Sequence, residues 1–582
     1  MSPAGTVART RAASLSELRA AGRLVVHLDG HVLCLFADGD AVRAVDNRCP
    51  HMGFPLHRGS LADGILTCHW HHARYDLCTG GTFDQWADDL RTFPTEVDGD
   101  DVYVDLSPPP YPVIHQRRRL QDGLERNLPL VVAKAAIVLE EGDPTGADAF
   151  GIGLDFGVAR RGEGWFRGLT TLTCLMNLVP RLDPVERAAA LYHGLSDVAD
   201  DSAGGAPRIQ MAPLTGGLAE PWRMTGWLRR FVEVRDAEGA ERVLVSAARG
   251  GLAPKELADM LFAAATDHRY LDGGHTLDFV NKALEALDSA GWERAEPVLA
   301  SLAPQLAFAE RMEEANSWRH PVDIVALLEA AFDELPAAVR EGEGRRGAWG
   351  GRHELVGVVL TAEPDESLRA LLGALREGAD EVELASAVAH AAVTRIARFP
   401  TTNEFGDWDT ALHTFTFASA VEQGLRRSPS PELLRGVLDA AMSVHLDRFL
   451  NVPATRLPEP EPDVSPDALL DELPRLLDEQ QRVDDAGRLV VSYLAAGGSP
   501  EKLVGALCSS LLRENRNFHT IQCVEAAVRQ HGLLDGTGEE ALPLVAAARY
   551  LAAHAPTTRS QRQTFEIARR LHRGERLYED AD

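Results

Sequence analysis

The sequence predicts a multidomain protein, in which an all-β N-terminal domain precedes a large, mostly α-helical region with divergent internal repeats. At 582 residues the chain is too long for a single hydrophobic core. Short β-rich runs fill residues 24–106, whereas apolar residues recur every three or four positions beyond about residue 112. Three helical segments also share one pattern, which indicates duplication.

The N-terminal strands are predicted by their alternation with turn residues. Residues 24–45 read LVVHL, HVLCLF and AVRAV, separated by Asp-Gly turns, as in a β-meander. The pattern resumes at residues 65–67, continues through RTFPTEV at residues 91–97, and ends with VYVDL at residues 102–106. The proline run at residues 108–110 then marks the first domain boundary.

Changes of composition divide the rest of the chain. We expect residues 1–106 to form the β domain and residues 107–160 to form a linker and a first helix. A helical domain would span residues 161–456, followed by a C-terminal helical block at residues 457–582. The proline- and acid-rich segment LPEPEPDVSPD marks this last boundary.

Composition and charge exclude several classes of function. A formal charge of −28 argues against a general binder of nucleic acids or anionic membranes. No apolar run reaches the roughly 18 residues that a membrane span needs, and the N-terminus lacks an apolar signal-peptide core. We therefore expect a cytoplasmic protein. Its 7 cysteines are too few for a disulfide scaffold, so metal ligation must be considered first.

Four cysteine and histidine residues have the spacing of a metal cluster site. Cys49 and His51 form a C-x-H motif, and Cys68 and His71 form a C-x-x-H motif after sixteen intervening residues. Two such loops can bind a [2Fe–2S] cluster, with both thiolates on one iron and both imidazoles on the other. Neutral imidazoles make the cluster easier to reduce, with a potential of about −150 to +300 mV. The motif predicts electron transfer.

Residues 15–106, with the segments CPHMGFPL and CHWHHARYDLCTGG, resemble a Rieske [2Fe–2S] ferredoxin domain. Respiratory Rieske proteins carry an extra cysteine in each loop, but Phe54 and Trp70 stand at these positions here. The resemblance therefore implies a cluster without a loop disulfide.

Other positions of the two loops refine this resemblance. Ala73 replaces a serine that donates to a cluster sulfur, whereas the tyrosine position is kept as Tyr75. Losing one donor lowers the potential, so the resemblance implies the low-potential, ferredoxin or oxygenase-like type. His72 stands where glycine is usual, and the sequence gives no reason for it.

No standard oxygenase motif in the sequence identifies the group that accepts the electrons. A ring-hydroxylating oxygenase would carry Asp-x-x-His with a second histidine five or six residues later. The nearest candidate, Asp267-His268 with His275, has an interval of seven residues and is broken by Gly273-Gly274. We therefore do not predict that enzyme class.

A nucleotide-binding motif is also absent from the sequence. Gly151, Gly153 and Gly157 do not match G-x-G-x-x-G and precede no visible βαβ unit, so we expect a loop there. This favours electron delivery by a separate reductase.

Three histidines recur at equivalent places in the helical region. In each segment an amphipathic helix precedes a His-Thr pair at or near the start of another helix, with His275, His413 and His519 as the histidines. Any one of them alone fits a helix cap or a core residue. Duplicated units place equivalent residues on one face, where they can converge as ligands of a second metal or as acid/base groups. His193 and His268 are weaker candidates.

The same segments resemble the bacterial questin oxidase-like proteins. The resemblance rests on HTLDFVNKALEAL, LHTFTFASAVEQGL and HTIQCVEAAVRQH, and would cover residues 160–570. It implies an oxidative reaction on a small aromatic or polyketide-like substrate, with oxygen insertion that uses a reduced nicotinamide cofactor. That family has no Rieske domain, so its electron source would differ.

Two hypotheses of function follow. In the first, the protein is an oxidoreductase that passes electrons from a reductase to the helical region, in a monooxygenase-type reaction. In the second, the N-terminal domain is a non-catalytic electron carrier or redox sensor, and the helices form a docking region for partner proteins. An acidic surface suits a basic reductase in both.

Overall fold

The computed structural model describes residues 9–107, 112–216, 220–575 and 577. The proline run at residues 108–110 and the first eight residues of the N-terminus lie outside the described residues, so the linker and signal-peptide expectations fall partly there. Contacts group the chain into two compact units. The first comprises Met1–Gly142 and Gln563–Asp582, and the second comprises Asp143–Arg562.

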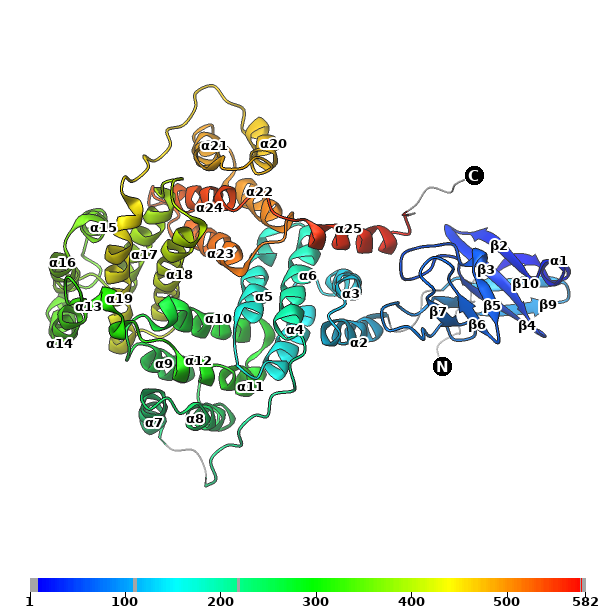
Figure 1. The fold of residues 1–582 in the computed structure, drawn as a ribbon, viewed down its shortest axis with the longest axis horizontal. Helices are drawn as coiled ribbons and strands as arrows, with labels where there is room; N and C mark the ends of the chain where they lie inside the picture. Colours follow the sequence, from blue (N-terminus) through cyan, green and yellow to red (C-terminus); the bar gives the residue numbers. More distant parts are fainter. Residues whose placement is uncertain (1–8, 108–111, 217–219, 576, 578–582) are drawn as a thin grey trace. The chain divides into compact units, whose positions relative to one another are not determined.

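The β-strands of the first unit form three small antiparallel sheets (Figure 1). Their orders are β1-β10-β9, β2-β3-β4-β8 and β5-β6-β7. The strands are β1 (Arg9–Ser14), β2 (Arg23–Leu28), β3 (His31–Asp38), β4 (Ala41–Asp46), β5 (Ser60–Ala62), β6 (Ile65–Thr67), β7 (Arg74–Asp76), β8 (Thr92–Phe93), β9 (Thr95–Asp98) and β10 (Asp101–Asp105).

The predicted fold class, an all-β N-terminal domain followed by a mostly helical region, is confirmed. Two details differ from the expected strands. A strand that was not expected, β1, begins at Arg9 and pairs with β10 in the register Thr10↔Val104. Pro94, which has no N–H group to donate, separates β8 from β9 where one strand was expected.

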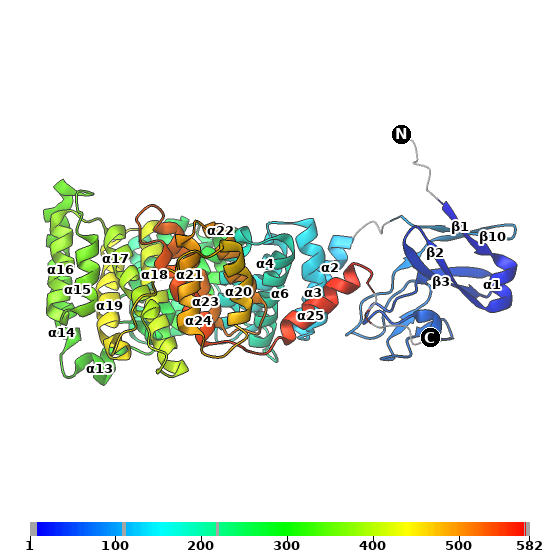
Figure 2. The same ribbon diagram turned by 90° about the horizontal axis from the view of Figure 1, so that it is seen from above.

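Helices make up most of the rest of the chain (Figures 1 and 2). Their bounds are α1 (Leu15–Ala21), α2 (Pro112–Glu125), α3 (Pro129–Gly142), α4 (Ala147–Arg160), α5 (Arg167–Leu178), α6 (Pro184–Asp201), α7 (Pro221–Glu233), α8 (Ala237–Arg249), α9 (Pro254–Ala265), α10 (His275–Ala290), α11 (Ala295–Ala300), α12 (Ala303–Phe308), α13 (Asn316–Arg319), α14 (Ile324–Gly342), α15 (Arg352–Thr361), α16 (Pro364–Glu377), α17 (Glu381–Ala397), α18 (Phe405–Arg427), α19 (Pro431–Leu446), α20 (Pro466–Leu476), α21 (Val483–Ala495), α22 (Pro500–Leu512), α23 (Phe518–Leu533), α24 (Ala541–Ala553) and α25 (Ser560–His572).

Four helices of the second unit pack as a bundle. Helices α5 and α18 each contact both α10 and α23, so α10 and α23 lie diagonally across the bundle. Asn517 caps α23 by accepting a hydrogen bond from the Thr520 N–H at 2.9 Å. Gly274, at φ +96°, precedes α10, where a Cβ atom would meet the Tyr270 ring at 2.8 Å. Asn517 and Gly274 therefore determine where α23 and α10 begin.

The segment around Gly151 is helical, so the expectation of a loop is wrong. It lies in α4, and its glycines face neighbouring helices at close range. A Cβ atom on Gly153 would meet Leu195 at 2.5 Å, and one on Gly157 would meet Leu169 at 2.5 Å. The glycines therefore permit close helix packing rather than a turn.

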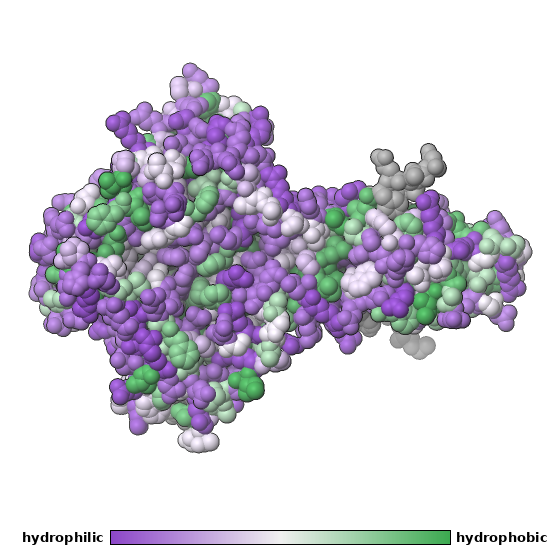
Figure 3. Space-filling view, viewed as in Figure 1, coloured by the Kyte–Doolittle hydropathy of each residue, from purple (hydrophilic) through white to green (hydrophobic). Residues whose placement is uncertain are grey.

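Figure 3 shows hydrophilic side chains over most of the visible face, with apolar ones scattered among them. Among the described residues, no helix combines the length and the apolar character that crossing a bilayer would require.

Candidate functional site

Two tight loops hold the four predicted cluster ligands. The first follows β4 and carries Cys49 and His51, and the second joins β6 to β7 and carries Cys68 and His71. In the first loop the Cys49 N–H donates to the Phe54 carbonyl at 2.8 Å, and in the second the Cys68 N–H donates to the Ala73 carbonyl at 2.8 Å. These short turns fix the backbone on which each thiol is carried.

The four side chains form a donor set that fits a [2Fe–2S] cluster. The two thiols are buried and within hydrogen-bonding reach of each other. The imidazoles of His51 and His71 lie edge to face, with ring centroids 4.8 Å apart. The Nδ1 atom of His51 is buried and has no hydrogen-bond partner. Two thiolates and two imidazoles are the ligands of a Rieske cluster, so these residues would hold one.

Further hydrogen bonds point at the two sulfur atoms. The Tyr75 hydroxyl lies 3.1 Å from the Cys49 Sγ atom, where it can donate. The Cys68 thiolate is favoured by hydrogen bonds from the Cys49 thiol and from the backbone N–H groups of Trp70 and His71. Together these hydrogen bonds lower the pKa of Cys68 to about 6, although burial raises it. Donors of this kind stabilise the extra negative charge of a reduced cluster.

The unusual residues of the two loops have the following surroundings and backbone conformations. Phe54 and Trp70, at the positions of the respiratory loop cysteines, contact each other with ring centroids 6.0 Å apart. Ala73 is fully buried. His72 has φ +65°, in the left-handed region, which explains why glycine is usual at this position.

A charged network attaches the first cluster loop to the helices of the same unit. Lys134 of α3 donates to the Pro50 carbonyl and, at 3.0 Å, to the Asp88 carboxylate. Arg119 of α2 donates to the same carboxylate at 3.0 Å. Burial first, then the charges of His71 and Lys134, lower the pKa of His51 to about 4. The imidazole is therefore neutral, as a metal ligand must be.

A pocket of about 630 Å³ adjoins this loop. Cys49 and Pro50 line it together with Leu90, Val138 and Leu571.

His275, His413 and His519 converge in the second unit. They come from α10, α18 and α23, and one ligand atom of each lies within 4.8 Å of the others. The Nε2 atoms of His413 and His519 are 3.0 Å apart, and the His275 and His413 ring centroids are 4.3 Å apart. The Nδ1 atom of His275 is buried without a hydrogen-bond partner. We call these residues the histidine triad; its donor set fits a metal ion.

Only two of the triad residues lie near a helix start. His275 is the first residue of α10 and His519 the second of α23, whereas His413 lies inside α18. The expectation that each histidine stands at or near a helix start is therefore wrong for His413. Glu404 and Asp407 form a capping box that starts α18 earlier than expected.

A carboxylate that the sequence analysis missed lies behind the triad. The Asp409 Oδ2 atom is 3.4 Å from the Nδ1 atom of His519. Tyr550 donates a hydrogen bond to the other oxygen of Asp409. Carboxylates placed behind a ligating histidine orient its ring and raise its basicity. The available signal was the position of Asp409, four residues before His413 and hence on the same face of a helix.

Two histidines of the triad, His275 and His413, favour the neutral form. Burial, followed by the neighbouring histidines, lowers the pKa of His275 to about 3. Burial and His519 lower the pKa of His413 to about 4. Neutral imidazoles are the form that binds metals.

The two weaker candidates lie elsewhere. His193 is buried in α6, and its Nε2 atom has no hydrogen-bond partner. The ring of His268 lies between Glu313 and Glu233, with N–O distances of 2.6 and 3.0 Å. The structure therefore does not bring either residue into the triad.

We expect His193 to make the protein less stable in acid. Burial, and then the charge of Arg562, lower its pKa to about 3, whereas an unfolded histidine has a pKa of about 6.5. The unfolded chain therefore binds a proton that the native state does not, and stability falls as the pH drops below about 6.5 towards 3. At about 1.4 kcal/mol per pKa unit, this amounts to a few kcal/mol.

The pH dependence of unfolding of a His193→Gln variant checks this expectation. Its free energy of unfolding should fall less steeply between neutral and acidic pH than that of the wild type. Equal slopes would show that His193 carries no such linkage.

Comparisons with known proteins agree with the geometry of the cluster site. A family model of the Rieske [2Fe-2S] domain matches residues 9–94. The naphthalene 1,2-dioxygenase system ferredoxin component of Pseudomonas aeruginosa is 30% identical over 97 residues, which cover 16% of this chain and 93% of that protein. The 3-phenylpropionate/cinnamic acid dioxygenase ferredoxin subunit of Shigella boydii is 35% identical over 77 residues, covering 13% and 73%.

Two further similarities extend the comparison. Human apoptosis-inducing factor 3 is 37% identical over 79 residues, and the match spans only 13% of each chain. A solved structure, the ferredoxin of carbazole 1,9a-dioxygenase from Nocardioides aromaticivorans IC177, is 26% identical and has a TM-score of 0.16. The match covers 17% of this chain and 98% of that one.

The chain thus belongs to the Rieske [2Fe–2S] family through its N-terminal region. This region is an iron–sulfur electron-transfer domain similar to the ferredoxins of dioxygenase systems. The match of the family model ends at residue 94, before α2 begins, and leaves the helical unit without an assigned function.

Proposed function

We propose that the protein is an oxidoreductase in which the Rieske cluster accepts electrons from a separate reductase and passes them to a metal at the histidine triad. The convergence of the triad is the observation that carries this proposal. Its ligand atoms lie within 4.8 Å, although His413 and His519 are 106 residues apart in the sequence. The three imidazoles and the carboxylate of Asp409 come together from helices far apart in the chain.

The chemistry of the triad suits a redox metal. Imidazole nitrogens bind iron, copper and zinc well, and three protein ligands leave positions open for other molecules. A metal held there would supply a redox centre that the cluster can reduce one electron at a time. The protein's own contribution is to keep His275 and His413 neutral and to orient His519 through Asp409.

We infer an oxygenation of the monooxygenase type. One oxygen atom of dioxygen would enter a small aromatic or polyketide-like substrate, and the other would leave as water with two electrons and two protons. The resemblance of the three segments to questin oxidase-like proteins supports this substrate class. Aromatic side chains also lie beside the triad, with ring centroids of Phe279 and Phe518 at 5.4 and 5.6 Å from that of His275.

Reoxidation of the cluster tests this proposal. The full chain, reconstituted with iron, would be reduced under anaerobic conditions and mixed with dioxygen, while the paramagnetic resonance signal of the reduced cluster is followed. Removing one triad ligand in His519→Ala should slow reoxidation at least about tenfold, because the cluster loses its electron acceptor. His531→Ala, on the same helix but hydrogen-bonded to the Glu540 carbonyl instead, is the matched control.

The alternative, a carrier or redox sensor without a catalytic site, predicts other results. Iron analysis would then give only the two irons of the cluster for each chain. Reoxidation would be equally fast in the wild type and in His519→Ala. Either result would overturn the transfer of electrons to the triad.

A further inference from the structure

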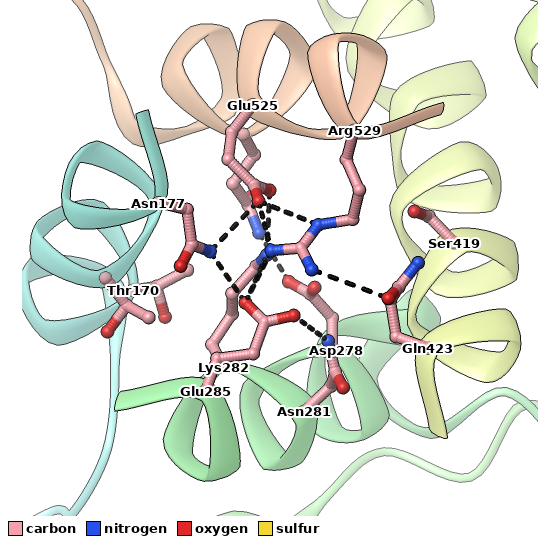
Figure 4. A network of polar contacts seen from close by, with 12 residues as sticks. Thr170, Asn177, Asp278, Asn281, Lys282, Glu285, Ser419, Gln423, Glu525 and Arg529 are labelled. Carbon is pink, nitrogen blue, oxygen red and sulfur yellow. Dashed lines mark hydrogen bonds and ion pairs between the residues drawn. The ribbon is translucent and has the colours of Figure 1, made fainter. Parts of the chain in front are cut away.

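The interior of the bundle that carries the triad is polar (Figure 4). On each of the three helices, polar side chains follow the triad histidine at intervals of three or four residues. Residues at these intervals lie on one face of a helix. Helix α5 adds Asn177 to the same interior. The residues concerned are Asp278, Lys282 and Glu285 on α10, Thr416, Ser419 and Gln423 on α18, and Gln522, Glu525 and Arg529 on α23.

The positive and negative side chains of this interior neutralise one another. Lys282 donates to Glu285 at 3.0 Å and to Glu525 at 2.7 Å. Arg529 donates to Glu525 at 2.7 Å and lies 3.2 Å from Glu285. Two cations therefore neutralise two carboxylates, which leaves no cation to neutralise a further carboxylate.

Asp278 is that further carboxylate, and its surroundings favour the protonated form. It is buried, and it accepts a hydrogen bond from the side-chain amide of Gln522. Burial is the main cause that raises the pKa of Asp278 to about 7. The charges of Glu285 and Glu525 act in the same direction, against that of Lys282.

The groups around Asp278 come from all four helices. Lys282 and Glu285 lie on its own helix and Glu525 on α23, with Arg529 behind Glu525. Cys174 on α5 is a further titratable neighbour. The α18 residues that line this region, Thr416, Ser419, Ala420 and Gln423, are uncharged.

A small cavity beside Asp278 shares lining residues with a cleft. The cavity has about 10 Å³, which is the size of one water molecule, and Asp278 lines it. A cleft of about 380 Å³ lies beyond, and Asn281, Gln423 and Arg529 line both spaces. The cleft reaches the surface at the exposed Asp288.

Three buried polar atoms beside the cavity have no hydrogen-bond partner. They are Asn281 Oδ1, Gln423 Nε2 and Gln522 Oε1. A water molecule in the cavity needs two to four polar partners, and these atoms can supply them. The cavity is therefore suited to water.

Asp278 lies about one helical turn from the triad. It follows His275 by three residues on α10, and Gln522, which donates to it, follows His519 by three residues on α23. The Nδ1 atom of His275 has no hydrogen-bond partner. Polar groups thus extend from the surface cleft to Asp278, one helical turn along α10 from His275.

We propose that Asp278 relays protons from the cleft at Asp288, through the water-sized cavity, to the histidine triad. This inference rests on the proposed function, because reduction of dioxygen there consumes one proton for each electron that the cluster delivers. The Asp278 carboxylic acid gives its proton towards the triad and becomes a carboxylate. A proton from bulk water, passing through the cavity, then restores the acid.

Two measurements test the relay. The first is the infrared carbonyl band of a protonated carboxylic acid, followed across neutral pH in the metal-free, oxidised protein and in deuterated buffer. The wild type should show a titrating, exchangeable band that Asp278→Asn lacks. The second is reoxidation of the reduced cluster by dioxygen. Asp278→Asn should slow it about a hundredfold, and Asp278→Glu should restore most of the rate.

Asp197→Asn is the matched control. Burial also raises the pKa of Asp197 to about 7, but this residue lies on α6, outside the bundle. The control should lose a band and keep the rate of reoxidation. Metal content is measured in every variant, and it should not change in Asp278→Asn.

The outcomes separate the relay from the function on which it rests. If the infrared spectra of wild type and Asp278→Asn are the same, Asp278 carries no exchangeable proton and the relay is overturned. If Asp278→Asn is reoxidised at the wild-type rate while His519→Ala is slow, the relay fails and the proposed function stands. If wild type and His519→Ala are reoxidised equally fast, both fail.

Discussion

Replacing His413 by alanine is expected to remove metal binding from the helical unit and to leave the Rieske cluster intact. His413 has the central place in the triad, with its Nε2 atom 3.0 Å from that of His519 and its ring 4.3 Å from that of His275. Residues that only support a ligand contribute 10- to 100-fold to metal affinity, so loss of a ligand should cost more than about a hundredfold. Elemental analysis after dialysis against a chelator measures the loss.

The cluster provides an internal reference for this experiment. Its four ligands lie in the other compact unit, so the variant should retain two irons and the Rieske resonance signal. His390→Ala is the matched control, because His390 is also a buried helical histidine but lies near Glu539, outside the triad. Equal metal contents in wild type, His413→Ala and His390→Ala would show that the triad binds no metal.

The cluster site was the part most predictable from sequence, because its ligands are close in the chain. Two short loops and a fixed spacing place Cys49, His51, Cys68 and His71, and the strands around them follow from local alternation and turns. The missed strand β1 pairs with β10, at Thr10↔Val104, a partner almost a hundred residues away. The local sequence pattern does not indicate that two strands so far apart in the chain will pair.

In the helical unit, the packing of the helices could not be predicted from the sequence. The recurrence of His275, His413 and His519 indicated a common face, but no local feature showed that three helices would meet there. Charged residues such as Lys282 and Glu525 are typical of solvated helix faces, yet they are buried as a pair that is 243 residues apart in sequence. Their burial follows from helix packing, which the sequence pattern does not specify.

The glycines of α4 were misinterpreted for a related reason. Gly151, Gly153 and Gly157 indicate a loop by propensity, since glycine destabilises a helix by about 1 kcal/mol relative to alanine. Gly153 and Gly157 pack closely against Leu172, Leu195 and Leu169, with which any larger side chain would collide, and this packing offsets the cost. Gly151 lies against Arg294 instead. Tertiary packing thus overrides the local preference.

Replacing Asp409 by asparagine is expected to weaken metal binding at the triad by about 10- to 100-fold without unfolding α18. Asparagine keeps the size of the side chain but loses the negative charge that faces the Nδ1 atom of His519 at 3.4 Å. The imidazole then becomes a poorer donor, and its ring is held less firmly. Competition with a chromophoric chelator measures the affinity, and thermal unfolding shows whether the helix is intact.

A neighbouring substitution separates this electronic effect from a change in the helix. Asp407→Asn, two residues earlier on α18, removes a carboxylate of the capping box that does not face the triad. It should lower stability by about 1 kcal/mol or less and leave metal affinity unchanged. If the two variants lose affinity equally, Asp409 acts through the fold of α18. If only Asp409→Asn loses it, the carboxylate acts on the metal through His519, as its position behind the ring requires.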